Sequence, residues 1–185
     1  MKNQFSVLCL LFSVVGLLTG CNLLPKPQAD TVRHFTLNGP TGTAPVADAT
    51  QVRPVQVAGH LRGRTMAVRV AEHEVTYLDD VRWAEPLGDA IAQMLRDRLG
   101  SVGGGATVTV QVLRCELVRS AGNSVQVAAT YLIVPANGDK AAPFRGTFMA
   151  SPRTWDGRDY GALVAQLREG IGELGDAIAA AVEHR

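Results

Sequence analysis

The chain has 185 residues, of which 46% are hydrophobic, 5% aromatic and 19% charged. This is about the length of one domain, with enough apolar material for a core and too little charge for a disordered tail. The 18 basic and 17 acidic residues give a net charge of +1. Domains that bind nucleic acid normally carry a clear positive excess, so the charge balance argues against such a partner.

The first twenty residues have the features of a secretory signal. Lys2 precedes an apolar stretch over residues 6–18, which matches the charged start and the hydrophobic region of a signal peptide. The stretch is shorter than the roughly 20 apolar residues that a transmembrane helix needs. We therefore expect residues 1–20 to be a signal peptide that is removed.

The end of this signal resembles the bacterial lipobox. Its sequence is Leu18-Thr19-Gly20-Cys21, and the resemblance implies that Cys21 becomes acylated. The alternative is an ordinary secretory cleavage near Gly20, which leaves Cys21 as a free thiol. Several acyl chains together anchor a protein stably, whereas one chain does not. The residue after the cysteine is Asn22. In this the sequence resembles Gram-negative lipoproteins that are released to the outer membrane.

A short polar segment separates the lipidation site from the folded part. Residues 21–32 contain Pro25 and Pro27 and have no apolar periodicity, so we expect an acylated tether. Residues 33–185 then form a periplasmic domain. Once the signal is removed, Cys115 is the only cysteine besides the acylated one, which makes an intramolecular disulfide impossible.

The first half of the domain predicts short strands. They cover residues 33–37, 51–57, 66–71 and 74–77, and the last two form a hairpin that turns near His73. Pro54 lies inside the second strand, where it cannot donate a ladder hydrogen bond. It therefore indicates an edge position or a bulge.

The period then changes to that of a helix. From Pro86 onward apolar residues recur every four positions, at Leu87, Ile91, Leu95 and Leu99. This pattern predicts an amphipathic helix that ends at the glycines of residues 100–105. A second helix is predicted after Pro152 from Leu163, Leu167, Ile171, Leu174, Ile178 and Val182.

Three runs rich in β-formers separate the two helices. They cover residues 107–113, 124–134 and 143–150 and are expected to form an antiparallel meander. The predicted fold is α+β: a mostly antiparallel sheet with two amphipathic helices packed on one face, in the order strands, helix, strands, helix.

Motifs for catalysis or metal binding are incomplete. The glycines of residues 100–105 follow a helix and lack the Lys-Ser/Thr of a phosphate loop. His73-Glu74 is not continued as His-Glu-x-x-His, and no Gly-x-Ser-x-Gly elbow is present. Cys115 is expected to be a buried small hydrophobe rather than a nucleophile, and Asp79-Asp80 to be solvated turn acids. We expect no enzyme activity, no metal and no cofactor.

Several segments together resemble a known family. They are the first strand Phe35-Thr36-Leu37, the second strand Val55-Gln56-Val57, the stretch Leu61 to Arg69 followed by Tyr77, and the segment Val81 to Leu87. In this order they are similar to the ABC-type transport auxiliary lipoprotein family, with its PqiC-like members. The match is good from the lipobox to Leu99. Beyond that only the pattern of strands and helix agrees.

The most specific part of the resemblance is Arg82-Trp83-Ala84-Glu85-Pro86-Leu87. Pro86 suits the first helical position and Glu85 the positive end of the helix dipole. Arg82 can pair with Glu85 or with a carbonyl group. Trp83 is either a core residue or an anchor that faces a partner. We regard Arg82, Trp83, Glu85, Pro86 and Leu87 as the candidate interface, and Cys21 as the lipid attachment site.

The resemblance implies an outer-membrane lipoprotein on the periplasmic side, an auxiliary subunit of an MCE/ABC-type lipid transport system that supports envelope integrity. Its partners would be an MCE-domain protein of the PqiB-like kind and inner-membrane transport components. Family members also form oligomeric rings, which implies a homo-oligomer. A lipoprotein that activates or scaffolds a cell-wall synthetic enzyme is the alternative, because small α+β domains serve both functions.

Overall fold

The structure is a computed structural model that describes residues 30–39, 46–136 and 142–184. Val32–Arg185 form one compact unit, to which all the helices and strands below belong. The signal peptide, Cys21 and most of the tether lie outside the described residues, so those predictions stay predictions.

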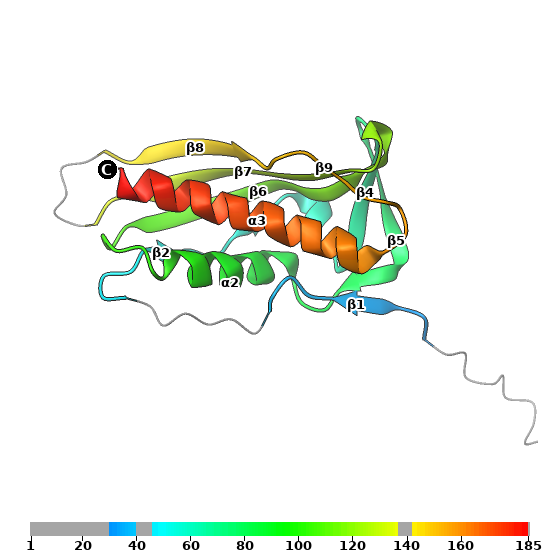
Figure 1. Ribbon diagram of the computed structural model, residues 1–185, viewed down its shortest axis with the longest axis horizontal. Helices are drawn as coiled ribbons and strands as arrows, with labels where there is room; N and C mark the ends of the chain where they lie inside the picture. Colours follow the sequence, from blue (N-terminus) through cyan, green and yellow to red (C-terminus); the bar gives the residue numbers. More distant parts are fainter. Residues whose placement is uncertain (1–29, 40–45, 137–141, 185) are drawn as a thin grey trace, which may run out of the picture. The chain divides into compact units, whose positions relative to one another are not determined.

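The elements follow one another in the order strands, helix, strands, helix (Figure 1). The first group consists of β1 (Arg33–Phe35), β2 (Gln51–Val52), β3 (Gln56–Val57), the 3-10 turn η2 (Gly59–Leu61), β4 (Thr65–Ala71) and β5 (Glu74–Trp83), and is followed by helix α2 (Leu87–Leu99). The second group consists of β6 (Thr107–Val118), the 3-10 turn η3 (Arg119–Ala121), β7 (Ser124–Val134), β8 (Phe144–Met149) and β9 (Arg153–Thr154), and is followed by helix α3 (Tyr160–Glu183).

Within the described residues, the strands form one mixed sheet in the order β1-β5-β4-β6-β7-β8. The predicted hairpin β4–β5 and the meander β6–β7–β8 are antiparallel. However, β1 pairs with β5 in parallel, and β2, β3 and β4 pair in parallel with β6. The expectation of a mostly antiparallel sheet was therefore wrong.

The cause of this error lies in β6. This strand is long enough to accept three partners along the same edge, with β2 and β3 beside its first half and β4 beside its end. Apolar alternation shows which residues face the core, but it does not show which strands pair or in which direction. Pro54 lies between β2 and β3, and in the described part of the chain both strands pair only with β6, which agrees with an edge position.

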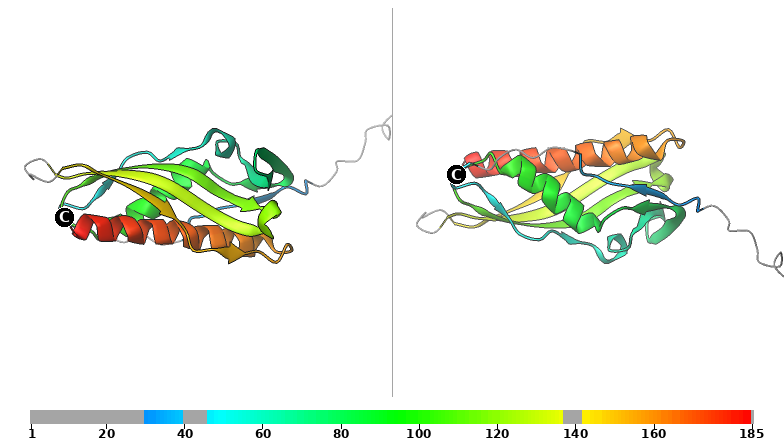
Figure 2. Two further views of the ribbon diagram at one scale, coloured as in Figure 1. Left: turned by 90° about the horizontal axis from the view of Figure 1, so that it is seen from above. Right: turned by 90° about the horizontal axis from the view of Figure 1, so that it is seen from below.

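Both helices lie on the same face of the sheet (Figures 1 and 2). They contact each other, and α2 packs on β2 while α3 packs on β7. Pro86 is the residue just before α2, which begins at Leu87. The predicted stripes of both helices are buried, except for the last position, Val182, which is half-buried. The buried residues are Leu87, Ile91, Leu95 and Leu99 in α2, and Leu163, Leu167, Ile171, Leu174 and Ile178 in α3. Burial of these side chains is the main stabilising contribution to this layer.

A glycine allows α3 to approach the sheet closely. A Cβ atom on Gly170 would lie 2.8 Å from Cγ2 of Val127 in β7 and 3.3 Å from Cβ of Ala150. Two residues further on, a Cβ atom on Gly172 would meet nothing within 4 Å. Helix α3 is thus packed tightly against the sheet at Gly170, whereas the space beside Gly172 is open.

One local prediction before α2 was wrong. Asp79 and Asp80 are exposed residues of β5, which continues to Trp83, and they do not form a turn. The parallel pairing of β1 with β5 at residues 81–83 explains the difference, because it extends β5 beyond the part paired in the hairpin.

Candidate functional site

The family-like segment from Arg82 to Leu87 joins β5 to α2. Its apolar members are buried, with exposed fractions of 3% for Trp83 and 2% for Leu87. Arg82 and Pro86 are exposed and Glu85 is half-buried. Of the two possibilities for Trp83, the structure thus gives the core position. An interface role for the exposed members stays a prediction.

Glu85 organises the chain that follows β1. Its Oε1 atom accepts hydrogen bonds from Oγ1 of Thr36 at 2.8 Å and from Nδ2 of Asn38 at 2.9 Å. The backbone N–H of Asn38 donates in turn to Oγ1 of Thr36 at 3.2 Å. Glu85 therefore binds two polar side chains of the first strand region, and the suggested pair with Arg82 is not formed.

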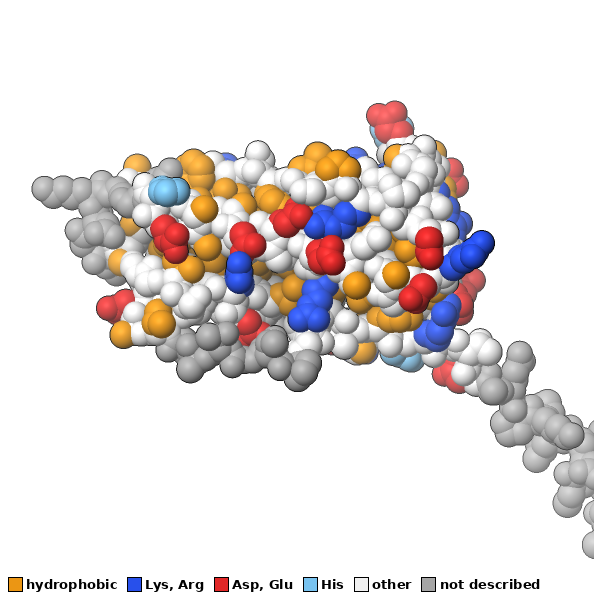
Figure 3. Space-filling view, in the orientation of Figure 1, with side chains coloured by type: hydrophobic (Ala, Val, Ile, Leu, Met, Phe, Trp, Pro, Cys, Tyr) orange, Lys and Arg blue, Asp and Glu red, His pale blue; other side chains and the backbone are white. Residues whose placement is uncertain are grey.

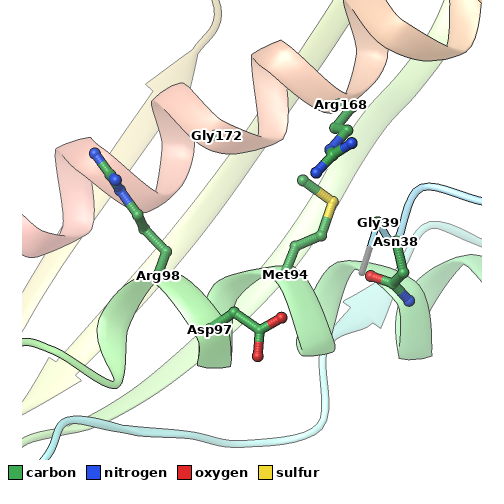
Figure 4. A pocket seen from close by; sticks show the side chains of 7 residues that line it. All are labelled: Asn38, Gly39, Met94, Asp97, Arg98, Arg168 and Gly172. Carbon is green, nitrogen blue, oxygen red and sulfur yellow. The ribbon is translucent and has the colours of Figure 1, made fainter. Parts of the chain in front are cut away.

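Asn38 leads to a cleft between the two helices (Figure 4). The cleft has a volume of about 280 Å³ and is lined by Asn38, Gly39, Met94, Asp97, Arg98, Arg168 and Gly172. Arg168 from α3 and Met94 from α2 point toward one another across it. Because Glu85 holds Asn38, the family-like segment fixes one wall of this cleft.

The two arginines of the cleft differ in their partners. Arg98 forms an ion pair with Asp176 of α3. For Arg168, by contrast, the described residues provide neither a hydrogen bond nor an ion pair, although its guanidinium lies against Gly39. A Cβ atom on Gly39 would be only 2.9 Å from Nη2 of Arg168. Among the described residues the guanidinium of Arg168 therefore has no ion-pair partner, and it is placed to meet an anionic group of another molecule.

A second polar cluster lies within the sheet. Glu116 of β6 is fully buried, and its carboxylate binds Nε of Arg69 at 2.7 Å and Nε2 of His60 at 2.9 Å. These contacts join β4 and η2 to β6. Both carboxylate oxygens have partners, so the cluster is structural. The sequence offers one indication of this cluster, a single acidic residue, Glu116, in a strand rich in apolar residues. The cluster was not predicted from it.

Cys115 does not have the properties of a nucleophile. It is 2% exposed, and burial, together with the neighbouring negative charge of Glu116, raises the pKa of its thiol to about 12. The thiolate, which is the reactive form, is therefore scarce at neutral pH. The prediction of a buried cysteine is confirmed.

Metal ligands, membrane-spanning helices and charged patches are further features that could indicate a site. Among those residues, no cluster of three or more His, Cys, Asp or Glu side chains is arranged to hold a metal ion. None of the helices described there is both long and apolar enough to span a membrane. On the face shown in Figure 3, positive and negative side chains alternate without a large patch of one sign.

Comparisons with known proteins give one family. The model of the ABC-type transport auxiliary lipoprotein component matches residues 35–179, which include the cleft and the whole junction before α2. No curated protein sequence matches the chain significantly.

Solved structures share the fold. A crystal structure of an uncharacterized protein superposes with a TM-score of 0.63 at 17% identity, covering 80% of this chain and 97% of the other. A Xanthomonas campestris protein of the DUF330 family gives a TM-score of 0.63 at 14% identity, covering 81% of this chain and 95% of the other. At these identities the similarity shows the fold alone.

Proposed function

Since the chain belongs to the ABC-type transport auxiliary lipoprotein family, we propose that it is the outer-membrane-anchored subunit of an MCE/ABC-type intermembrane lipid transport system. Its role is to dock an MCE-domain protein on the periplasmic side of the outer membrane and so to support envelope integrity. It acts without catalysis of its own. The observation that carries the proposal is the family match over residues 35–179.

The anchor is the acylated Cys21. The lipobox around it and Asn22 after it support lipidation and release to the outer membrane. Acylation gives stable attachment because several chains insert together. The polar tether of residues 21–32 then separates the domain from the membrane.

The docking site is the cleft between α2 and α3. Arg168, which has no ion-pair partner among the described residues, supplies a positive charge there, and Met94 and the open surface at Gly172 supply apolar contact. A carboxylate of the partner protein beside Arg168 would give a charge-assisted hydrogen bond, which is among the stronger polar contacts. Glu85 of the family-like segment also sets the position of Asn38 in the wall of this cleft, so the segment supports the docking site whether or not its exposed residues touch the partner.

Fractionation tests the anchor. Wild-type protein is expected in the outer membrane. The Cys21→Ala variant is expected either as soluble periplasmic protein or as unprocessed precursor. A Cys21→Ala protein that still fractionates with the outer membrane would disprove anchoring through this residue.

Affinity purification from crosslinked envelopes tests the partner. The full-length protein is expected to bring down an MCE-domain protein and inner-membrane transport components. Recovery of a cell-wall synthase without any MCE-domain protein would favour the alternative role as an activator or scaffold of that enzyme.

A further inference from the structure

The face of the sheet that points away from both helices carries a shallow polar hollow. Helices α2 and α3 lie together on the other face (Figure 2), where Val110 and Ala129 are buried in the core. The hollow has a volume of about 150 Å³. Its polar lining residues are Gln56 of β3, Thr109 and Gln111 of β6, Thr130 of β7 and Arg145 of β8. They belong to four different strands, so only the pairing of these strands brings them together.

The register of the strands places these side chains next to one another. Gln56 pairs with Gln111, and Gln111 pairs with Thr130, so the three form a row across β3, β6 and β7. Arg145 pairs with Leu132, which is two residues from Thr130 on β7. Residues two apart along a strand share a face, and neighbouring strands are about 4.8 Å apart. Arg145 therefore lies at one end of the hollow and Gln56 at the other.

The polar side chains of the hollow have no partners in the described structure. Among residues 30–39, 46–136 and 142–184, no hydrogen bond or ion pair reaches the side chains of these five residues. Thr130 is half-buried and the other four are exposed. Arg145 is the one charged residue in the described lining. The hollow thus offers a single positive charge beside several neutral hydrogen-bonding groups.

The charge of Arg145 indicates a ligand group with one negative charge. A guanidinium group binds a carboxylate through two parallel hydrogen bonds, and the two charges then balance. The hydroxyl groups of Thr109 and Thr130 can donate further hydrogen bonds to the same carboxylate. A phosphate group with two negative charges would find one charge unmatched. The lining therefore favours a carboxylate.

The two glutamines indicate which groups adjoin this carboxylate. A glutamine side chain both donates and accepts hydrogen bonds, as a peptide group does. Gln111 and Gln56 follow one another across the sheet, away from Arg145, so they can bind successive peptide groups. The volume of the hollow is below the roughly 300 Å³ of pockets that enclose a drug-sized ligand. This favours the end of a longer chain over a free small molecule.

We propose that the polar hollow binds the free C-terminal end of a peptide, with the carboxylate on Arg145 and the last peptide groups on Gln111 and Gln56. The peptide lies across the strands on the face of the sheet, so it adds no strand to an edge. The hollow and the cleft that contains Arg168 lie on opposite faces of the sheet. The inference therefore does not depend on the docking proposed for the cleft.

Three small probes test the chemistry of the ligand. They are acetyl-trialanine with a free carboxylate, the same peptide with a C-terminal amide, and acetate. Each is titrated into the isotope-labelled full chain in detergent and followed by NMR. We expect the free peptide to bind in the millimolar range and to shift the resonances of residues 109–111, 130–132 and 145. The amidated peptide and acetate are expected to bind about tenfold more weakly, because each lacks one of the recognised groups.

Substitutions at exposed positions identify the residues that bind. Arg145→Gln is expected to weaken binding of the free peptide about tenfold, and Gln111→Ala about threefold. Acetate has no peptide group, so its affinity should fall with Arg145→Gln and stay unchanged with Gln111→Ala. Arg119→Gln, at an exposed arginine of η3 beyond the other end of β6, is the matched control. It is expected to bind all three probes like the wild type.

Four results would overturn the proposal. They are the absence of shifts at these residues with the free peptide, equal affinity for the free and the amidated peptide, acetate bound as tightly as the free peptide, and equal binding by Arg145→Gln and Arg119→Gln. Acetate bound as tightly as the peptide would mean a simple anion site. Binding of an MCE-domain protein at the cleft is measured separately, through Arg168, so the two proposals can fail independently.

Discussion

The two faces of the sheet are stabilised in different ways. The face under α2 and α3 is covered by regularly spaced aliphatic side chains, with β6 and β7 contributing Val110, Val127 and Ile133. The other face of the same strands carries polar residues such as Thr109, Gln111 and Thr130, together with the buried carboxylate of Glu116. Apolar packing builds the first face, whereas one ion cluster joins the elements of the second.

The largest expected effect is on the polar face. Glu116→Ala leaves Arg69 and His60 without their shared carboxylate, and we expect the free energy of unfolding to fall by about 3 kcal/mol. Thr130→Ala, a control on the same face, is expected to cost about 0.5 kcal/mol or less. Urea unfolding measures both. Equal effects of the two substitutions would mean that the cluster does not stabilise this face.

On the helix-covered face, tight packing at Gly170 predicts the next effect. Gly170→Ala introduces a Cβ atom 2.8 Å from Val127, so α3 or β7 must move. We expect a loss of about 1–3 kcal/mol, typical of overpacked cores. Thermal unfolding followed by circular dichroism measures it. An unchanged melting temperature would show that α3 is not tightly packed against β7 at Gly170.

Gly172→Ala is the matched substitution in the same helix, with the opposite sign. A Cβ atom at this position meets no other atom within 4 Å, and alanine is the better helix former. We expect a gain of about 0.5–1 kcal/mol in the same thermal experiment. Destabilisation by Gly172→Ala would contradict an open cleft at this point.

The smallest expected effect is the pH dependence of the stability that Glu173 of α3 contributes. The N–H of Ser151, and then Arg153, hold the pKa of Glu173 below its usual 4.5. Because the folded-state pKa is lowered, the stabilisation is present above pH 4.5 and is lost as the pH falls through the folded-state value. The difference in stability between wild type and Glu173→Gln should therefore shrink below pH 4.5. A difference that stays constant with pH would exclude this contribution.

The helices were predictable from the sequence, but the pairing of the strands was not. A period of four from Leu87 to Leu99 determines the buried stripe of α2, because each element carries its own pattern. The parallel contacts of β6 with β2 and β4 join segments far apart in the chain, and no local pattern encodes them. For the same reason the hydrogen bond between Asn38 and Glu85 could not be predicted, and neither could the wall of the cleft that it positions.

The place of Arg168 in the cleft could not be predicted from the sequence either. Among many scattered arginines, only the fold shows that Arg98 is paired with Asp176, whereas Arg168 has no ion-pair partner in the part of the chain that the structure describes. Sequence reasoning therefore identified the family-like segment and missed the surface that this segment helps to shape.

Direct binding between the purified full-length chain and a purified MCE-domain protein of the same organism tests the proposed docking most directly. We predict that the wild type binds, that Arg168→Glu weakens binding about tenfold, and that Arg119→Glu, an exposed arginine of η3, binds like the wild type. A wild-type chain that shows no binding to the MCE-domain protein would contradict the account.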